Sequence, residues 1–127
     1  MKREKEIMEV DFDCENDILF AFLDDEVYKD FEYSEFLNDF VSIDFNKNNV
    51  PIGVEISNAS EQFKTKKQHL NNIISGGITI LISEKKIELD INLLVLIHNK
   101  SAHLSPVSIV ENNDFSLPLI ETTMAMI

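Results

Sequence analysis

Apolar and polar residues alternate along most of this chain, and an alternation of period two is typical of strands that bury one face. Residues 7–12 place Met8, Val10 and Phe12 on one side, whereas residues 18–23 are apolar on both sides. We predict that these two segments form a first hairpin. Its second strand is expected to lie centrally in a sheet, with cover on both faces.

A second hairpin is predicted over residues 41–56, where two alternating runs flank an asparagine-rich turn at residues 46–49. Asparagine tolerates the positive φ that tight hairpin turns demand. Pro51 has no amide hydrogen to donate, which places its strand at a sheet edge or turns that position outward. Two hairpins in succession are expected to form a four-stranded meander.

Residues 24–38, which are acidic and aromatic, are compatible with an irregular strand or with a loop.

The period then changes to that of a helix. Asn58, followed by Glu61, matches a pattern in which a side chain caps the first helical turn. Apolar residues follow at helical spacing as far as Ile74, and the glycine pair at residues 76–77 is a suitable stop. We therefore predict one central helix over about residues 59–74. Further strands are expected at residues 78–83, 87–97, 102–110 and 118–126.

The expected fold class is α+β: an antiparallel meander, one central helix and a second antiparallel β region. We divide the chain into residues 1–60, the meander, and residues 61–127, the helix and β extension, which share one core. The strand at residues 18–23 and the apolar run at residues 93–97 need more cover than one helix supplies. A homodimer, formed by sheet extension or by packing of an apolar patch, would provide that cover.

Acidic residues are concentrated in the first third of the chain. Between Glu9 and Asp44 there are thirteen acids and one base, so this window accounts for the whole formal charge of −12. Such a segment repels nucleic-acid phosphates and favours a basic protein surface or cations. The alternative interpretation is a solvated face that keeps the protein soluble.

Other features of the composition limit the environment of the chain. None of its apolar runs approaches the length of a membrane span, and the charged beginning is unlike a signal peptide. The lone Cys14 excludes an internal disulfide and provides no metal-binding pair. We therefore expect a cytoplasmic protein.

Two stretches of the chain resemble the pattern of a known family. Residues 12–20 run from an aromatic residue and Asp through a turn into an apolar strand, and residues 50–60 contain Gly-Val-Glu-Ile-Ser and then Asn-Ala-Ser. Over residues 8–60 the chain resembles the short prokaryotic proteins catalogued as domain of unknown function 2283. It departs from them in lacking the usual turn glycine and in a longer segment at residues 24–40.

The resemblance implies a small antiparallel sheet packed on a helix, and no established activity. Some members lie beside small toxin-like proteins, which implies an antitoxin-like role. Glu55 is the acid that the resemblance singles out. A polar strand position that faces solvent or caps the helix is the favoured interpretation of Glu55, with a catalytic acid as the alternative.

Candidate metal ligands are few. Asp11, Asp13, Glu15 and Asp17 suggest a calcium loop, but the glycine and the late bidentate glutamate of an EF-hand are missing. A hairpin turn is the better interpretation of this stretch. His98 and His103 flank one predicted turn and could face each other across it, which makes them weak metal candidates. Zinc would need three or four converging ligands.

The sequence best supports a non-enzymatic interaction protein that uses its acidic surface against a basic protein, with an antitoxin-like role as the sharpest form. Nucleic acid and membrane are not expected as partners, and we assign no catalytic residue and no cofactor. The alternative is a small metal-binding or hydrolytic module around His98 and His103, near Ser101.

Overall fold

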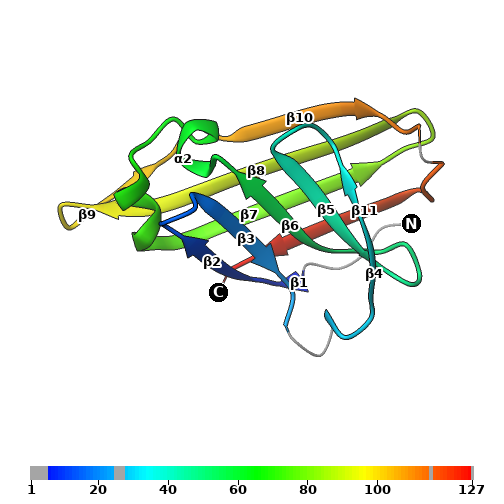
Figure 1. Ribbon diagram of the computed structural model, residues 1–127, viewed down its shortest axis with the longest axis horizontal. Helices are drawn as coiled ribbons and strands as arrows, with labels where there is room; N and C mark the ends of the chain where they lie inside the picture. The colour runs from blue at the N-terminus through cyan, green and yellow to red at the C-terminus, as the bar shows by residue number, and fades with distance from the viewer. Residues whose placement is uncertain (1–5, 25–27, 115, 127) are drawn as a thin grey trace.

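The computed structural model describes residues 6–24, 28–114 and 116–126. Two sheets pack face to face, and the strands of one cross those of the other obliquely (Figure 1). The five-stranded sheet has the order β2 (Glu9–Asp13), β3 (Ile18–Phe22), β6 (Pro51–Ser57), β5 (Val41–Asn46), β4 (Phe31–Phe36). The six-stranded sheet has the order β1 (Glu6–Ile7), β11 (Ile120–Ala125), β7 (Ile73–Ile82), β8 (Lys86–Ile97), β10 (Val107–Asn112), and β9 (Lys100–His103) also pairs with β8. The protein is therefore predominantly β, and the expected α+β class is wrong.

The five-stranded sheet does not have the order of a meander. β2 and β3 form the predicted first hairpin, and β5 and β6 form the second. The chain crosses from β3 to β4 at the far edge, and β6 then returns to pair with β3. This order is of the Greek-key type. The second β region is not a meander either, because the last strand, β11, pairs with β7.

β6 is the middle strand of its sheet, so Pro51 does not lie in an edge strand. Pro51 is the first residue of β6 and lies opposite Phe45, where the register with β5 shifts. Proline is tolerated at such a position because the first residue of a strand and a bulge do not need the hydrogen-bond donor that proline lacks.

The asparagine turn forms as expected. Asn49 has a φ of 62°, and the side-chain oxygen of Asn46 accepts hydrogen bonds from two backbone amides at the turn.

The central helix predicted over residues 59–74 does not form. The chain makes the short helix α2 (Ala59–Gln62), then a left-handed residue at Lys64 with a φ of 53°, then the 3-10 helix η1 (Lys67–Asn72). We call residues 58–72, which join the two sheets, the connector.

Strand pairing explains why the helix stops early. Ile73, which matched the helical spacing, begins β7 and pairs with Val95 of β8. The expected helix-stopping glycines lie within β7. A Cβ on Gly76 would come within 2.7 Å of the Leu93 side chain, so this glycine allows close packing between β7 and β8.

The start of α2 is capped from a distant part of the chain. Asn58 adopts a φ of 50°, and its side chain makes no capping hydrogen bond. Instead, the Asp17 carboxylate accepts hydrogen bonds from the backbone amide of Ser60 at 2.9 Å and from its hydroxyl at 2.6 Å. Because Asp17 lies in the turn between β2 and β3, this contact fixes the connector to the first hairpin.

The inner faces of both sheets form one apolar core, which includes Leu19, Phe45, Ile56, Ile80 and Leu89. The implied sheet-on-helix packing is thus replaced by packing of one sheet on the other. We expected both faces of β3 to be covered by other parts of the protein, but its outward-facing residues remain half-exposed.

Among the described residues, no helix has the length and apolar character needed to cross a membrane.

Thr122 provides a test of this packing. It is fully buried in β11, and its hydroxyl has no hydrogen-bond partner within the described residues. We expect Thr122→Val to raise the free energy of unfolding by about 1 kcal/mol, because it removes an unsatisfied hydroxyl while conserving shape. Urea unfolding measures this change. The same substitution at the outward-facing Thr123 is the control, and a loss of stability in Thr122→Val alone would contradict the predicted gain.

Candidate functional site

The outer face of the five-stranded sheet brings an aromatic ring between two carboxylates. The strand register places Phe20 of β3 opposite Asp11 on β2 and opposite Glu55 on β6. Side chains directly opposite each other on one face of a sheet lie about 5 Å apart at Cβ. This row therefore holds Phe20 between two acids from different strands.

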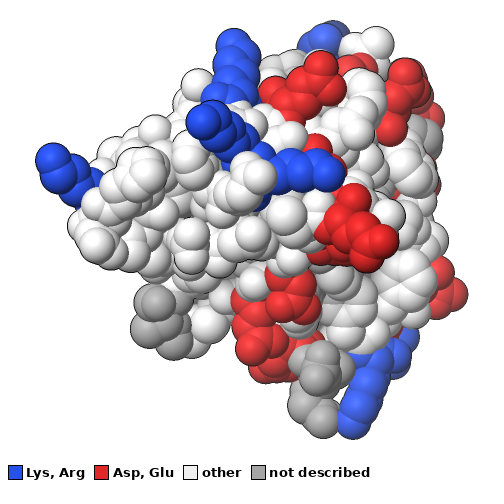
Figure 2. Space-filling view, turned by 60° about the vertical axis from the view of Figure 1, so that its left-hand side comes forward, with Lys and Arg blue, Asp and Glu red and all other residues white. Residues whose placement is uncertain are grey.

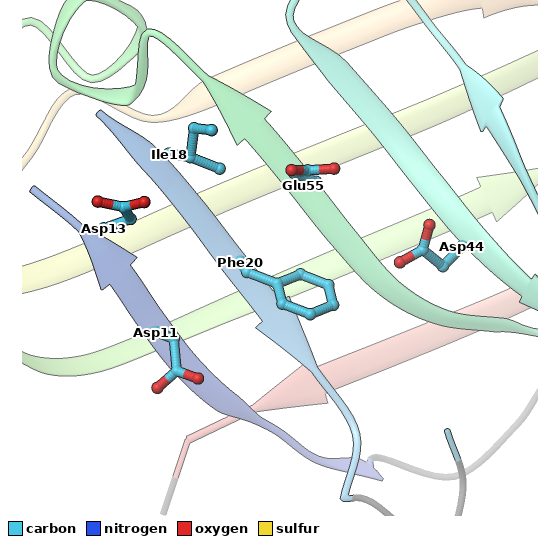
Figure 3. A pocket seen from close by; sticks show the side chains of 6 residues that line it. All are labelled: Asp11, Asp13, Ile18, Phe20, Asp44 and Glu55. Carbon is cyan, nitrogen blue, oxygen red and sulfur yellow. The ribbon is translucent and has the colours of Figure 1, made fainter. Parts of the chain in front are cut away.

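Neighbouring rows extend the same surface. Ile18 lies opposite Asp13 on β2, and Asp44 of β5 lies opposite Gly53 on β6. Together these side chains line a hollow of about 360 Å³ (Figure 3). We call this surface the acidic face; its lining residues are Asp11, Asp13, Ile18, Phe20, Asp44 and Glu55.

One wall of the hollow is held by hydrogen bonds. The hydroxyls of Tyr28 and Ser34 both donate to the carboxylate of Asp44. Asp44 is only 8% exposed, and a buried carboxylate needs such donors because burial removes its hydration. These bonds restrict the orientation of Asp44 at the edge of the hollow.

Gly53 is required by the position of Tyr28. A Cβ added to Gly53 would clash with the Tyr28 hydroxyl oxygen, so a larger residue would displace that ring. The structure thus gives distinct roles to two residues of the Gly-Val-Glu stretch. Gly53 makes room for Tyr28, and Glu55 is an exposed side chain that lines the hollow.

Aromatic rings continue from the hollow toward the edge of the sheet. The Phe20 ring centroid lies 4.9 Å from that of Phe22 and 5.5 Å from that of Tyr28, the latter pair edge-on. Tyr28 in turn stacks on Phe31 at 6.2 Å. The acidic face therefore borders a half-exposed aromatic surface.

The electrostatics of the acidic face favour a cationic ligand. None of the described residues that line the hollow is a base. Hydrogen bonds from the side chain and the backbone of Asn16 hold the pKa of Asp13 below its ordinary value, with a smaller contribution from Lys67. Asp13 is therefore ionised at neutral pH, and clustered negative charge attracts cations.

The structure does not bring the predicted histidine pair together. His98 lies in the turn after β8 with a φ of 50°, whereas His103 pairs with Leu94 further along the hairpin. His98 instead shares a surface hollow with His69 of η1. Throughout the described ranges, no three His, Cys, Asp or Glu side chains are grouped so that they could hold a metal ion.

The carboxylates of the calcium-like stretch are also used separately. Asp17 accepts its hydrogen bonds from Ser60, and Asp13 accepts from Asn16. Cys14, in the same hairpin, lies 3.7 Å from the side-chain nitrogen of Asn71 in the connector. The stretch therefore forms a turn that contacts the connector.

Sequence patterns identified some members of the acidic face but not the site as a whole. The acidic window contained Asp11, Asp13 and Asp44, and the family resemblance singled out Glu55. Nothing in the sequence joined them to Phe20, because the pairing of β3 with β6 depends on residues far apart in the chain.

Comparisons with known proteins leave the family unassigned. No family model matches the chain, so the resemblance to domain of unknown function 2283 stays a prediction. A curated protein of Methanosarcina mazei, named "Putative hypoxanthine phosphoribosyltransferase", is 29% identical over 100 residues, which cover 79% of this chain and 78% of that protein. No solved structure matches.

The titration of Tyr28 tests the geometry of the acidic face. Burial, followed by the hydrogen bond to Asp44, raises the pKa of Tyr28 above its ordinary value of about 10. The stabilising contribution should be complete below about pH 10 and decrease at higher pH, because the unfolded chain loses the phenol proton first. Urea unfolding across this range, together with tyrosinate absorbance, measures the effect.

Tyr28→Phe should remove part of this pH dependence. The chain has a second tyrosine, Tyr33, whose pKa is also raised by burial, so Tyr33→Phe is the matched comparison. If Tyr28→Phe left the decrease above about pH 10 unchanged, the burial of the Tyr28 hydroxyl and its hydrogen bond to Asp44 would be contradicted.

Proposed function

We propose that this protein is a non-enzymatic binding protein whose acidic face takes a basic segment of a partner protein. The observation that carries this proposal is the placement of Phe20 between Asp11 and Glu55 in a hollow whose described lining contains no base. Carboxylates attract ammonium and guanidinium groups, and an aromatic ring adds a cation–π contact.

The sheet makes this surface a suitable platform for a cationic side chain. The lining residues stand on paired strands, so their spacing is set by backbone hydrogen bonds rather than by a loop. Negative charge in the first third of the chain would also accelerate encounter with a basic partner. The most specific form of the proposal is an antitoxin-like role, with a basic toxin-like protein as the partner.

We also propose a cytoplasmic location.

The acidic face does not favour the activity named for the Methanosarcina mazei relative. Transfer of a phosphoribosyl group to hypoxanthine requires a site for a phosphorylated sugar, and the carboxylates of this hollow repel phosphate. In the described part of the chain these carboxylates are not grouped to share a neutralising metal ion. The alternative centred on His98 and His103 has no supporting contact between the two residues.

Neutralising the acidic face should weaken binding of a basic peptide. We expect the double variant Asp11→Asn, Glu55→Gln to lower the affinity for a disordered Arg- and Lys-rich peptide by about tenfold at low salt. The dependence of the affinity on salt should also become shallower. Isothermal titration calorimetry at several salt concentrations measures both, with a peptide in which Gln replaces every base as the reference.

The other sheet offers a matched control. Glu121 and Glu88 lie on either side of Leu81, in a row of the same acid–apolar–acid kind. Glu88→Gln, Glu121→Gln removes the same charge and should leave the peptide affinity nearly unchanged. Equal losses in the two double variants would show a general effect of net charge and would count against the proposal.

We further propose that the expected homodimer forms through β4. This strand lies at the edge of its sheet, and its Phe31 and Phe36 are 46% and 65% exposed. A second copy paired along this edge would cover both rings. Sedimentation should then give a dimeric mass that Phe36→Glu reduces to a monomeric one. Val110→Glu, at an exposed edge position of the other sheet, is the control, and a monomeric mass for the unaltered protein would refute the dimer.

A further inference from the structure

Half of the described lysines of this acidic protein lie at one end of the molecule, namely Lys64, Lys66, Lys67 and Lys100. Figure 2 shows Lys side chains on the end that carries the connector and the β9 hairpin, with Asp and Glu side chains on the adjoining surface. Between the connector and the turn after β8 lies a surface hollow of about 450 Å³. We call it the basic hollow; Lys66, His69 and His98 line it.

Two separate segments build the basic hollow. The 3-10 helix η1 packs against β8, which brings His69 beside the turn that follows β8. His98 occupies that turn in the left-handed conformation, which is uncommon outside glycine but favoured for Asn, Asp and His. The ring of His69 is held by a 2.8 Å hydrogen bond between its Nδ1 and the Thr65 hydroxyl.

The charges of the basic hollow are opposite to those of the protein as a whole. The chain carries a formal charge of −12, yet every ionisable side chain among the described residues that line this hollow is a lysine or a histidine. The amides of Gln68 and Asn72 provide further hydrogen-bond donors. The ammonium group of Lys66 disfavours a metal cation between the two histidines, whereas it would bind an anion.

From this arrangement we infer that the basic hollow binds a small phosphate-type dianion. Lysine supplies a point charge, and the imidazoles and amides supply directed donors, which is the donor set that phosphate oxygens accept. Leu96 and Ile97 form an apolar side of the hollow, which can contact the carbon skeleton of a phosphate ester. This inference does not depend on the function proposed for the acidic face.

The charge around the basic hollow favours an anion. The charged groups that face His69 are Lys66 within the hollow and Glu61 and Lys64 in the adjoining depression of the connector. Glu61 opposes the anion only from outside the hollow, so the charge facing the ligand stays positive.

Sulfate is a suitable probe, because it is tetrahedral like phosphate and is a dianion throughout the neutral range. In an NMR titration at constant ionic strength, we expect saturable shifts of backbone amides in residues 66–72 and 98–99. The affinities for inorganic phosphate and for glycerol 3-phosphate are then compared, with glycerol as a blank. This comparison distinguishes a free phosphate ion from a phosphate ester as the natural ligand. Tighter binding of the ester identifies a phosphorylated small molecule, and equal binding identifies the free ion.

Variants locate the binding in the hollow. Lys66→Gln should weaken sulfate binding by about tenfold. His98→Asn, which suits the left-handed turn, should also weaken sulfate binding, because it removes an imidazole from the lining of the hollow. Lys100→Gln removes a charge from the same hairpin outside the described lining of the hollow and should leave the affinity nearly unchanged.

Two results would overturn the inference. One is a set of non-saturating shifts spread over all lysines, and the other is an equal loss of affinity in Lys66→Gln and Lys100→Gln. Either would indicate general ion screening. Asp11→Asn, Glu55→Gln should retain sulfate binding, so failure of the basic hollow and failure of the acidic face remain distinguishable.

Discussion

The central strands of this protein bury one side against the opposite sheet, and the period of two along a strand then decides what its other side presents. In β3, Leu19 and Ala21 enter the core, so Phe20 must point outward. The same rule sends Asp11 on β2 and Glu55 on β6 to the outer side. A shift of one residue in register would bury the acids and expose the core residues, so the packing that stabilises the fold also positions the acidic face.

Local patterns predicted both hairpins of the first half, because alternation is a local property. The strand predicted over residues 102–110 is instead divided into β9 and β10. The central helix was wrong because Ile73 fits both a helical spacing and a strand, and its pairing with Val95 decides the outcome. The cap of α2 was misassigned for a similar reason: Asp17, which supplies it, is 43 residues away from Ser60.

The candidate site was predictable only in part. Its acids were visible as a window of like charge, and Gly53 and Glu55 as a short motif. Their relation to Phe20 and Tyr28 was not visible, because it results from non-local strand order and from a ring that occupies the space above Gly53. Likewise His98 was identified, but with His103 as its neighbour rather than His69.

The two surfaces give the molecule a marked charge asymmetry. The acidic face lies on the outer side of one sheet, whereas the basic hollow lies where the connector meets the end of β8. The connector joins the two regions: its Ser60 donates hydrogen bonds to Asp17 in the turn that follows Asp13, and its Lys66 lines the basic hollow. The segment predicted to be a structural helix thus adjoins both candidate ligand sites.

The position of β11 has a consequence for synthesis of the protein. Among the described strands β11 is the last to be made, yet it lies between β1 and β7, and it is the partner with which β1 pairs. Until residues 120–125 have left the ribosome, β7 therefore has an open edge and β1 has to wait for its partner. Incomplete chains would expose that edge to other nascent chains, whereas the five-stranded sheet, with all its strands within residues 9–57, can assemble early.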